Sequence, residues 1–296
     1  MKKNAAVVLC ALAYAAAVLV AAAVGYALRS QHPLIMIAAA DAAGTLVIFL
    51  FSIGFNNSSF YDPYWSVAPM VIAAYWALSP ISDGADLLRQ FVVLAFVCFW
   101  GTRLTFNFLR GWGGLEHEDW RYADLREKNG RAFWFVSFTG IHFVPTILVY
   151  LGCLPFYAIF TAQDRPFGLL DGIAAAVTLI AIAFETVADH QLRRFVHTNQ
   201  EPGRILDTGL WAYSRHPNYF GEVLFWWGLF LFAVAADPAR WWTIVGAVSI
   251  TLLFLFISLP LIEKRMAKKP GYAEHAHKIP LLIPWFPQKA SPDSSS

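Results

Sequence analysis

The segment from Tyr213 to Glu222, Tyr-Ser-Arg-His-Pro-Asn-Tyr-Phe-Gly-Glu, holds the densest cluster of polar side chains in the sequence. Pro217 suits the first turn of a helix, and the residue before a proline is biased to extended backbone, so we expect a helix to begin here. Asn218 and Glu222 then share one helix face. Arg215 and the free N–H groups of this helix end could hold a phosphate. The alternative for Glu222 is a neutral acid that is hydrogen-bonded within a helical bundle.

A second cluster is the stretch Tyr61-Asp-Pro-Tyr-Trp65. Asp62 together with Tyr61 or Tyr64 would supply a proton donor beside an apolar cavity. Desolvation raises the pKa of a carboxyl group, so such an aspartate could act as an acid near neutral pH. The alternative is a plain turn with aromatic side chains at a membrane interface.

Two charged stripes have the spacing of one helix face, three or four residues apart. They are Arg103, Asn107 and Arg110, and Glu185, Asp189 and Arg193. The first stripe could face an anion or could anchor a helix end at the membrane interface. Carboxylates at a helix C-terminus oppose the helix dipole, so the second stripe needs a partner, such as a ribose or carboxamide group. The alternative there is a local pair between Asp189 and Arg193.

The remaining polar residues indicate no particular reaction or ligand. His142 and Asp41 are isolated within apolar runs, and we expect them to pack or to hydrogen-bond inside a bundle. No set of His, Cys and carboxylate residues has the spacing of metal ligands, so we predict no metal site. The cysteines also lie in apolar runs, where packing is their expected role: Cys10, Cys98 and Cys153.

Composition identifies the elements that must hold these residues. Of 296 residues, 58% are hydrophobic and only 14% are charged, with a mean hydropathy of +0.51. A soluble globular chain carries roughly 25% charged residues. This composition excludes a disordered chain, a coiled coil and an ordinary cytosolic enzyme, and it indicates a lipid bilayer as the surroundings. A formal charge of +2 gives no reason to expect nucleic-acid binding.

Eight apolar stretches are candidates for crossing the hydrocarbon core, which takes about 20 residues as a helix. They are 5–28, 34–54, 67–81, 91–109, 133–160, 169–187, 218–236 and 241–262. The third is short, so the count is seven if it or the second does not cross. Pro145 and Pro155 should kink or break the fifth. We predict an all-α, polytopic integral membrane bundle of seven or eight helices, with one transmembrane domain over 1–287 and a disordered tail over 288–296.

The run Leu-Trp-x-Tyr-Ser-Arg-His-Pro-Asn-Tyr-Phe-Gly-Glu, which ends at Glu222, resembles the signature of the DUF1295 family in the steroid 5α-reductase superfamily. The resemblance covers most of residues 60–287. Further matching stretches are Tyr61–Pro69, Arg103, Glu118–Tyr122, Asp189-x-Gln191, Leu261–Lys264 and Ile283–Trp285.

The resemblance implies an integral membrane reductase that uses NADPH to saturate a conjugated carbon–carbon double bond in a lipophilic enone, such as a 3-oxo-4-ene steroid. It implies that Asn218 and Glu222 hold the nicotinamide end of the cofactor. The animal enzymes polarise the substrate carbonyl with a glutamate and a tyrosine. Asp62 matches the glutamate, whereas Trp100 stands at the tyrosine position, so Tyr61 or Tyr64 would supply the hydroxyl.

The predicted catalytic residues are therefore Asp62, Tyr61 and Tyr64. The predicted cofactor-binding residues combine the polar clusters, the resemblance and the basic C-terminal segment. They are Asn218, Glu222, Asp189, Arg193, Arg103, Asn107, Tyr213, Arg215, His216, Arg265 and Tyr272.

Two other functions stay open at this stage. Isoprenylcysteine and phospholipid methyltransferases carry a similar Arg-His-Pro element, so a membrane methyltransferase that uses S-adenosylmethionine is the alternative, with Glu222 on the amino group of that cofactor. A transporter or lipid-binding protein would also explain buried charges. It predicts inverted repeats, which this sequence does not display.

Loop charge predicts the orientation in the membrane. Basic residues concentrate in 110–132, in 188–217 and after 263, and basic loops stay in the cytoplasm. Cysteines introduced into these three segments should therefore react with a membrane-impermeant maleimide only from the cytoplasmic side. Labelling of any of the three segments from the opposite side would contradict this orientation.

Overall fold

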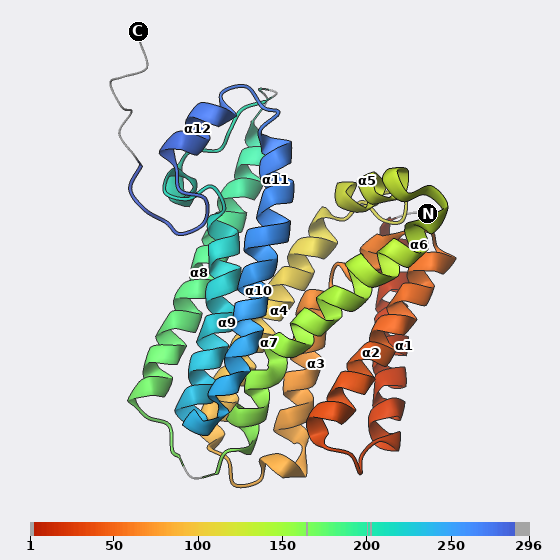
Figure 1. Cartoon of the computed structure of the whole chain (residues 1–296), viewed down its shortest axis with the longest axis vertical. Coiled ribbons are helices and arrows are strands. Elements are labelled where there is room, and N and C mark those ends of the chain that lie inside the picture. Colours follow the sequence, from red (N-terminus) through yellow and green to blue (C-terminus); the bar gives the residue numbers. More distant parts are fainter. Residues whose placement is uncertain (1–2, 164, 200, 202, 288–296) are drawn as a thin grey trace. The chain divides into compact units, whose positions relative to one another are not determined.

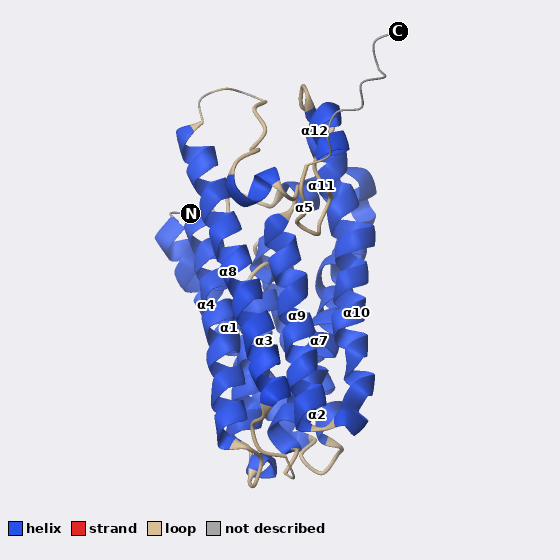
Figure 2. Cartoon of the chain, turned by 90° about the vertical axis from the view of Figure 1, so that its left-hand side faces the viewer, coloured by secondary structure: helices blue, strands red, loops and turns tan. Residues whose placement is uncertain are grey.

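The computed structural model describes residues 3–163, 165–199, 201 and 203–287, and the predicted tail, 288–296, lies outside this range. The described residues are mostly helical and contain no strand (Figure 2). Seven of their helices are long and apolar enough to cross a membrane. The chain is therefore an all-α, multi-pass membrane protein, as predicted. It divides into two compact units, Met1–Pro166 and Phe167–Ser296, and each is described by itself. A single domain over 1–287 stays a prediction.

The first unit contains the helices of the N-terminal half (Figure 1). They are α1 (Lys3–Ala27), α2 (Pro33–Gly54), η1 (Ser58–Tyr61), α3 (Tyr64–Leu78), η2 (Pro80–Ser82), α4 (Leu87–Gly111), α5 (Trp120–Asn129), η3 (Gly130–Ala132), α6 (Phe133–Val136), the π-helix η4 (Ser137–Phe143) and α7 (Val144–Thr161). α1 packs along α2, and α3 packs against both α4 and α7. Lys3 Nζ donates to the carbonyl oxygen of Arg110 at 3.0 Å, so the start of α1 and the end of α4 lie at the same end of this unit.

Local chemistry sets several of these helix ends. The carboxylate of Asp86 accepts the N–H of Arg89 at the start of α4, at 2.8 Å. At the start of α2, Pro33 occupies the first turn and the ring of His32 accepts the N–H of Leu34. Such caps satisfy N–H groups that have no partner within the helix. Large apolar side chains on the outer face of α1, such as Leu19, are exposed in the isolated chain, as expected of a surface that meets lipid.

The structure gives seven candidate spans because α3 is short. Its 15 residues rise about 22 Å, less than the roughly 30 Å of the hydrocarbon core. The fifth predicted stretch belongs to a helical run, Trp120–Thr161. This run is not a regular α-helix throughout, because the π-helix η4 directly precedes α7. Pro145 lies in the first turn of α7, where a missing N–H costs least, and Pro155 lies inside α7.

The second unit contains the remaining helices. They are α8 (Leu169–Thr198), η5 (Gly209–Ala212), α9 (Pro217–Ala236), η6 (Pro238–Thr243), α10 (Ile244–Leu253), the π-helix η7 (Phe254–Ser258), α11 (Leu259–Met266) and α12 (Tyr272–Lys278). α8 packs along α9, and two glycines of α9 allow a close approach. A Cβ on Gly221 would lie 2.8 Å from the carbonyl oxygen of Ala181, and one on Gly228 would lie 2.2 Å from Thr178 Oγ1. Small residues are the usual means by which membrane helices approach each other closely.

We expect Gly221→Ala to destabilise the protein, by about 1–3 kcal/mol, because its methyl group would press on the α8 backbone. Gly172→Ala is the matched control, since a Cβ there meets no described atom within 4 Å and alanine favours a helix. Thermal unfolding in detergent should show a lower melting temperature for Gly221→Ala only. Equal melting temperatures for the two variants would show that the contact between α8 and α9 is looser than the structure indicates.

Candidate active site

In the first unit, Asp62 forms an acid–tyrosine pair with Tyr122. Asp62 directly follows η1 and is half-buried, and its Oδ1 accepts a hydrogen bond from the Tyr122 hydroxyl at 2.5 Å. Arg121 is next to this pair and forms an ion pair with Asp119 at 2.7 Å. Its guanidinium carbon lies 5.5 Å from the centre of the Tyr122 ring. One carboxyl group, one phenol and one fixed cation therefore lie together at the start of α5.

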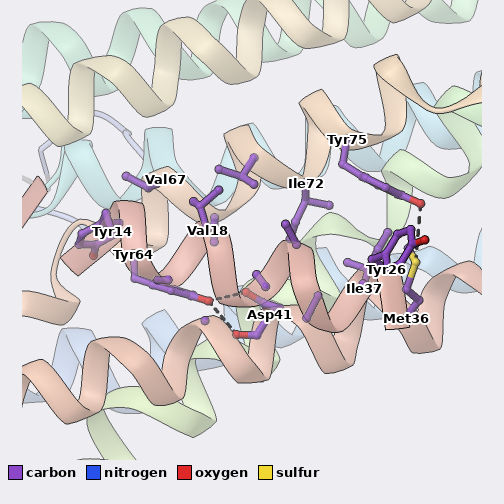
Figure 3. Close-up of a pocket in the computed structure, with 18 of the residues that line it drawn as sticks. Tyr14, Val18, Tyr26, Met36, Ile37, Asp41, Tyr64, Val67, Ile72 and Tyr75 are labelled. Carbon is purple, nitrogen blue, oxygen red and sulfur yellow. Dashed lines mark hydrogen bonds between the residues drawn. The ribbon is translucent and has the colours of Figure 1, made fainter. Parts of the chain in front are cut away.

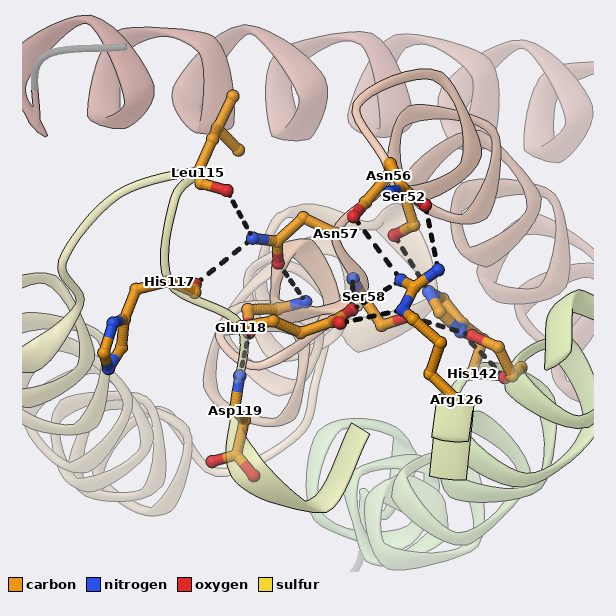
Figure 4. A network of polar contacts seen from close by, with 12 residues as sticks. Ser52, Asn56, Asn57, Ser58, Leu115, His117, Glu118, Asp119, Arg126 and His142 are labelled. Atoms are coloured by element: carbon orange, nitrogen blue, oxygen red, sulfur yellow. Dashed lines mark hydrogen bonds and ion pairs between the residues drawn. The ribbon is translucent and has the colours of Figure 1, made fainter. Parts of the chain in front are cut away.

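A polar clamp, consisting of Asn57, Ser58, Ser59, Glu118 and Arg126, holds the two loops that carry this pair (Figure 4). Glu118 Oε1 accepts the N–H of Ser58 at 2.8 Å and lies 3.0 Å from Arg126 Nη2. The Ser59 hydroxyl accepts the N–H of Asp119 at 3.0 Å. The clamp therefore fixes the chain just before Asp62 against the chain just before Tyr122.

Further contacts tighten the same clamp. The amide of Asn57 donates to the carbonyl oxygens of Leu115 and His117, at 3.1 and 3.2 Å (Figure 4). Arg126 also donates to Asn56 Oδ1 at 2.8 Å, and its guanidinium carbon lies 3.9 Å from the centre of the Phe133 ring. Cation–π contacts of this kind add to the ion pair. The position of Asp62 thus depends on a network rather than on one bond.

Burial raises the pKa of Asp62 from 3.8 to about 7. The hydrogen bond from Tyr122 and the charge of Arg121 act in the opposite direction, and desolvation outweighs them. Asp62 therefore holds a proton over much of the acidic range and can donate it near neutral pH, which is the property required of a general acid.

The other two predicted catalytic tyrosines have different partners. The Tyr61 hydroxyl lies 2.8 Å from Thr146 Oγ1. The Tyr64 hydroxyl donates to Oδ1 of Asp41 at 2.7 Å. Their rings stack on each other, with centres 5.0 Å apart. Trp100, at the position of the family tyrosine, is fully buried.

In the second unit, a carboxylate cluster forms around Glu263 of α11. Its Oε1 lies 2.7 Å from His216 Nε2 and accepts the Tyr272 hydroxyl at 2.5 Å, and its Oε2 pairs with the guanidinium of Arg215. Three of the predicted cofactor residues thus meet at one glutamate. Burial raises the pKa of Tyr272, and the hydrogen bond to the same glutamate raises it further.

The C-terminal segment fixes the backbone beside this cluster. Arg215 N–H donates to the carbonyl oxygen of Pro280 at 2.9 Å, and the Ser214 hydroxyl donates to that of Leu282 at 2.7 Å. Trp285 N–H donates to the carbonyl oxygen of Tyr213, also at 2.9 Å. Residues 280–285 therefore run beside 213–215 and hold the loop that leads into α9.

The helix predicted after His216 begins at Pro217, as expected. Asn218 is half-buried in the first turn of α9, and Glu222 is one turn further on, buried, with Oε1 accepting the indole N–H of Trp226 at 3.1 Å. Gly221 brings the α9 backbone against Glu185 of α8. The close helix contact therefore brings the residue before Glu222 against Glu185, the first residue of the predicted acidic stripe.

The other predicted cofactor residues are distributed over both units. Asp189 and Arg193 are half-buried on α8, and Arg265 is exposed on α11. Arg103 and Asn107 are half-buried on α4, in the first unit. Their binding of a cofactor stays a prediction.

Tyr122 and Glu263 hold central positions in these sites, although their residue types and spacing predict no role for them. Both lie in stretches that carry the family resemblance, Glu118–Tyr122 and Leu261–Lys264. The resemblance could therefore have indicated these two residues from the sequence, but it does not show which groups their side chains contact.

The groups of the second unit have the chemistry that a dinucleotide cofactor needs. Asn218 and Glu222 offer an amide and a carboxyl group one turn apart, which suits a carboxamide. Arg215 offers a cation next to the start of α9, and its Nε is buried without a hydrogen-bond partner among the described residues. A phosphate near this helix end would find both the cation and the N–H groups of the first turn, which have no partner within the helix.

Comparison with known proteins agrees with the resemblance. A family profile described as "Protein of unknown function (DUF1295)" matches residues 48–279. An uncharacterized protein of Schizosaccharomyces pombe, C594.04c, is 27% identical over 262 residues, covering 80% of this chain and 76% of that protein. No solved structure matches the chain.

The raised pKa of Asp62 predicts a pH dependence of stability. An unfolded aspartate has a pKa of about 3.9, so between about pH 4 and pH 7 only the folded state binds this proton. Its contribution is therefore full below pH 4 and is lost as the pH rises through 7. We expect Asp62→Asn to remove roughly 4 kcal/mol of pH-dependent stability over this range, because each unit of pKa shift corresponds to about 1.4 kcal/mol.

Melting temperatures measured from pH 4 to pH 8 in detergent would check this expectation. The wild-type protein should lose stability with rising pH more steeply than Asp62→Asn. Asp124→Asn, at an exposed position of α5, should keep the wild-type slope. A slope for Asp62→Asn equal to that of the wild type would show that Asp62 titrates like an ordinary surface carboxylate.

Proposed function

The chain belongs to the DUF1295 family, within the steroid 5α-reductase-like group, and from this membership we propose that it is a membrane reductase dependent on NADPH. The proposed reaction saturates a carbon–carbon double bond conjugated to a carbonyl group in a lipophilic substrate, such as a 3-oxo-4-ene steroid. The observation that carries the proposal is the pairing of Asp62 with Tyr122, with the pKa of Asp62 near neutrality.

The Asp62–Tyr122 pair suits the oxygen side of this reaction. Reduction at the β-carbon of an enone leaves negative charge on the carbonyl oxygen. Donors that are held in place before the reaction stabilise such charge without reorganising. Asp62 and Tyr122 are held in this way by the polar clamp, and protonated Asp62 can deliver a proton. Arg121 adds a positive charge beside the pair.

In this proposal the second unit binds the cofactor, which when bound supplies the hydride. Asn218 and Glu222 hold the carboxamide of the nicotinamide, and Arg215 with the start of α9 holds a phosphate. His216 and Tyr272 keep Glu263 paired, and this cluster orients Arg215. The basic segments around these residues face the cytoplasm, where the cofactor is available.

The direct test is to incubate the purified protein with NADPH and a panel of enone steroids. Mass spectrometry should detect a product that has gained two hydrogens. NADPH should also raise the melting temperature, and S-adenosylmethionine should not. The reverse thermal result would favour a membrane methyltransferase, which needs no acid for a carbonyl oxygen.

Substitutions in the two units should affect turnover and NADPH affinity differently. Asp62→Asn should lower turnover roughly 100- to 1,000-fold and leave NADPH affinity almost unchanged, because Asp62 acts on the substrate. Tyr122→Phe should cost less than Asp62→Asn but more than Tyr61→Phe or Tyr64→Phe, since only its hydroxyl contacts Asp62 among these three. Steady-state turnover and NADPH titration would separate the two effects.

Glu222→Gln should instead weaken NADPH binding or abolish turnover while the protein still folds. Glu274→Gln, at an exposed position of α12, is the matched control and should behave like the wild type. Unchanged kinetics in Glu222→Gln would remove Glu222 from the proposed cofactor site, and a loss of affinity in Asp62→Asn would remove Asp62 from the substrate.

A further inference from the structure

A cavity of about 430 Å³ lies among α1, α2 and α3 of the first unit (Figure 3). Its walls are almost entirely apolar, with Ala21 of α1, Ile37 of α2 and Ile72 of α3 among the lining residues. The volume is in the range of about 300–1,000 Å³ that is typical of small-molecule sites. Neither Asp62 nor Tyr122 lines it, and the proposed reduction does not use it.

One polar group in this cavity lacks a partner. Asp41 of α2 is only 7% exposed, and its Oδ1 accepts the hydroxyl of Tyr64 at 2.7 Å (Figure 3). Its Oδ2 is buried and has no hydrogen-bond partner among the described residues. A buried polar atom left unsatisfied costs about 1–3 kcal/mol, and a polar residue at membrane depth marks a functional site by default.

The sequence around Asp41 favours this arrangement. A Cβ on Gly44, almost one turn after Asp41, would lie 3.2 Å from the Tyr64 hydroxyl, so the glycine leaves room for the tyrosine to reach the aspartate. The same hydroxyl donates to the backbone carbonyl oxygen of Asp41 at 2.8 Å. Tyr64 thus engages one carboxyl oxygen and the backbone, and the second carboxyl oxygen is left for a ligand.

We propose that this cavity binds a neutral lipophilic alcohol, with the hydroxyl group on Asp41 Oδ2. A hydroxyl both donates and accepts, so it satisfies Oδ2 whether or not that oxygen carries a proton. The rest of the ligand must be mainly apolar, because the other lining residues are apolar except for Arg29 and three tyrosines, Tyr14, Tyr26 and Tyr75. A ketone only accepts, so it pairs with Oδ2 in one protonation state alone. The site is therefore distinct from the proposed enone site.

Photolabelling with a matched set of probes tests the proposal on the full-length protein in detergent. The probes are a diazirine-bearing hexadecanol, the corresponding hexadecane and the corresponding 2-hexadecanone. Mass spectrometry of digested protein should find the alcohol on peptides from α1, α2 and α3, at concentrations about tenfold lower than either other probe requires. Equal labelling by the alcohol and the alkane, or by the alcohol and the ketone, would overturn the assignment of a hydroxyl.

Substitutions at Asp41 test its role. Asp41→Ala should remove the preference for the alcohol, because Oδ2 is gone. Tyr64 keeps an acceptor in that variant, the backbone oxygen of residue 41. Asp41→Asn should retain the preference for the alcohol over the alkane, since an amide also hydrogen-bonds a hydroxyl. A preference for the alcohol that survives in Asp41→Ala would overturn the proposal.

A pair of substitutions on α1 tests the location without touching a polar group. Ala21 lines the cavity, and Ala21→Phe should fill it and reduce labelling by the alcohol at least tenfold. Ala23 is exposed and does not line the cavity, so Ala23→Phe should label like the wild type. Undiminished labelling in Ala21→Phe would place the alcohol elsewhere, and this result would stand even if Asp41→Ala failed to fold.

Discussion

A polar group buried in apolar surroundings without a hydrogen bond costs several kcal/mol, and this cost governs where the polar side chains of this protein lie. In the first unit they form a continuous buried chain. Thr146 contacts Thr45 and Tyr61, at 2.7 and 2.8 Å, and its hydroxyl also donates to the carbonyl oxygen of His142. The ring of His142 contacts Ser52 at 3.1 Å. Groups that are isolated in the sequence are thus paired in the fold.

Two glutamates provide hydrogen-bond acceptors for polar groups in the loops. Glu118 joins Ser58 and Arg126 in the first unit, and Glu263 joins Arg215, His216 and Tyr272 in the second. Each carboxylate has several donors, which is how a membrane protein retains charge without a large penalty. Glu118 holds the loop that leads to Asp62, and Glu263 contacts Arg215, the proposed phosphate-binding cation. The positions of Asp62 and Arg215 therefore depend on an electrostatic cluster and not on the helices alone.

The cavity at Asp41 departs from this pattern. There a buried oxygen has no partner among the described residues, although Tyr64 satisfies its neighbour. Natural proteins leave such groups unsatisfied mainly at functional sites. The two aspartates therefore differ. On α2, Asp41 Oδ2 has no hydrogen-bond partner among the described residues, whereas after η1, Asp62 Oδ1 accepts a hydrogen bond from Tyr122.

The sequence by itself determined the helical membrane architecture, because apolar runs of about 20 residues leave the backbone no other way to satisfy its hydrogen bonds. It also determined the start of α9, since Pro217 suits the first turn of a helix and biases the residue before it to extended backbone. Only the tertiary structure decided the partners of the polar groups. Tyr122 is 60 residues from Asp62, and Glu263 is 47 residues from His216. Pairing over such distances depends on how helices pack and loops fold back, which local pattern does not encode.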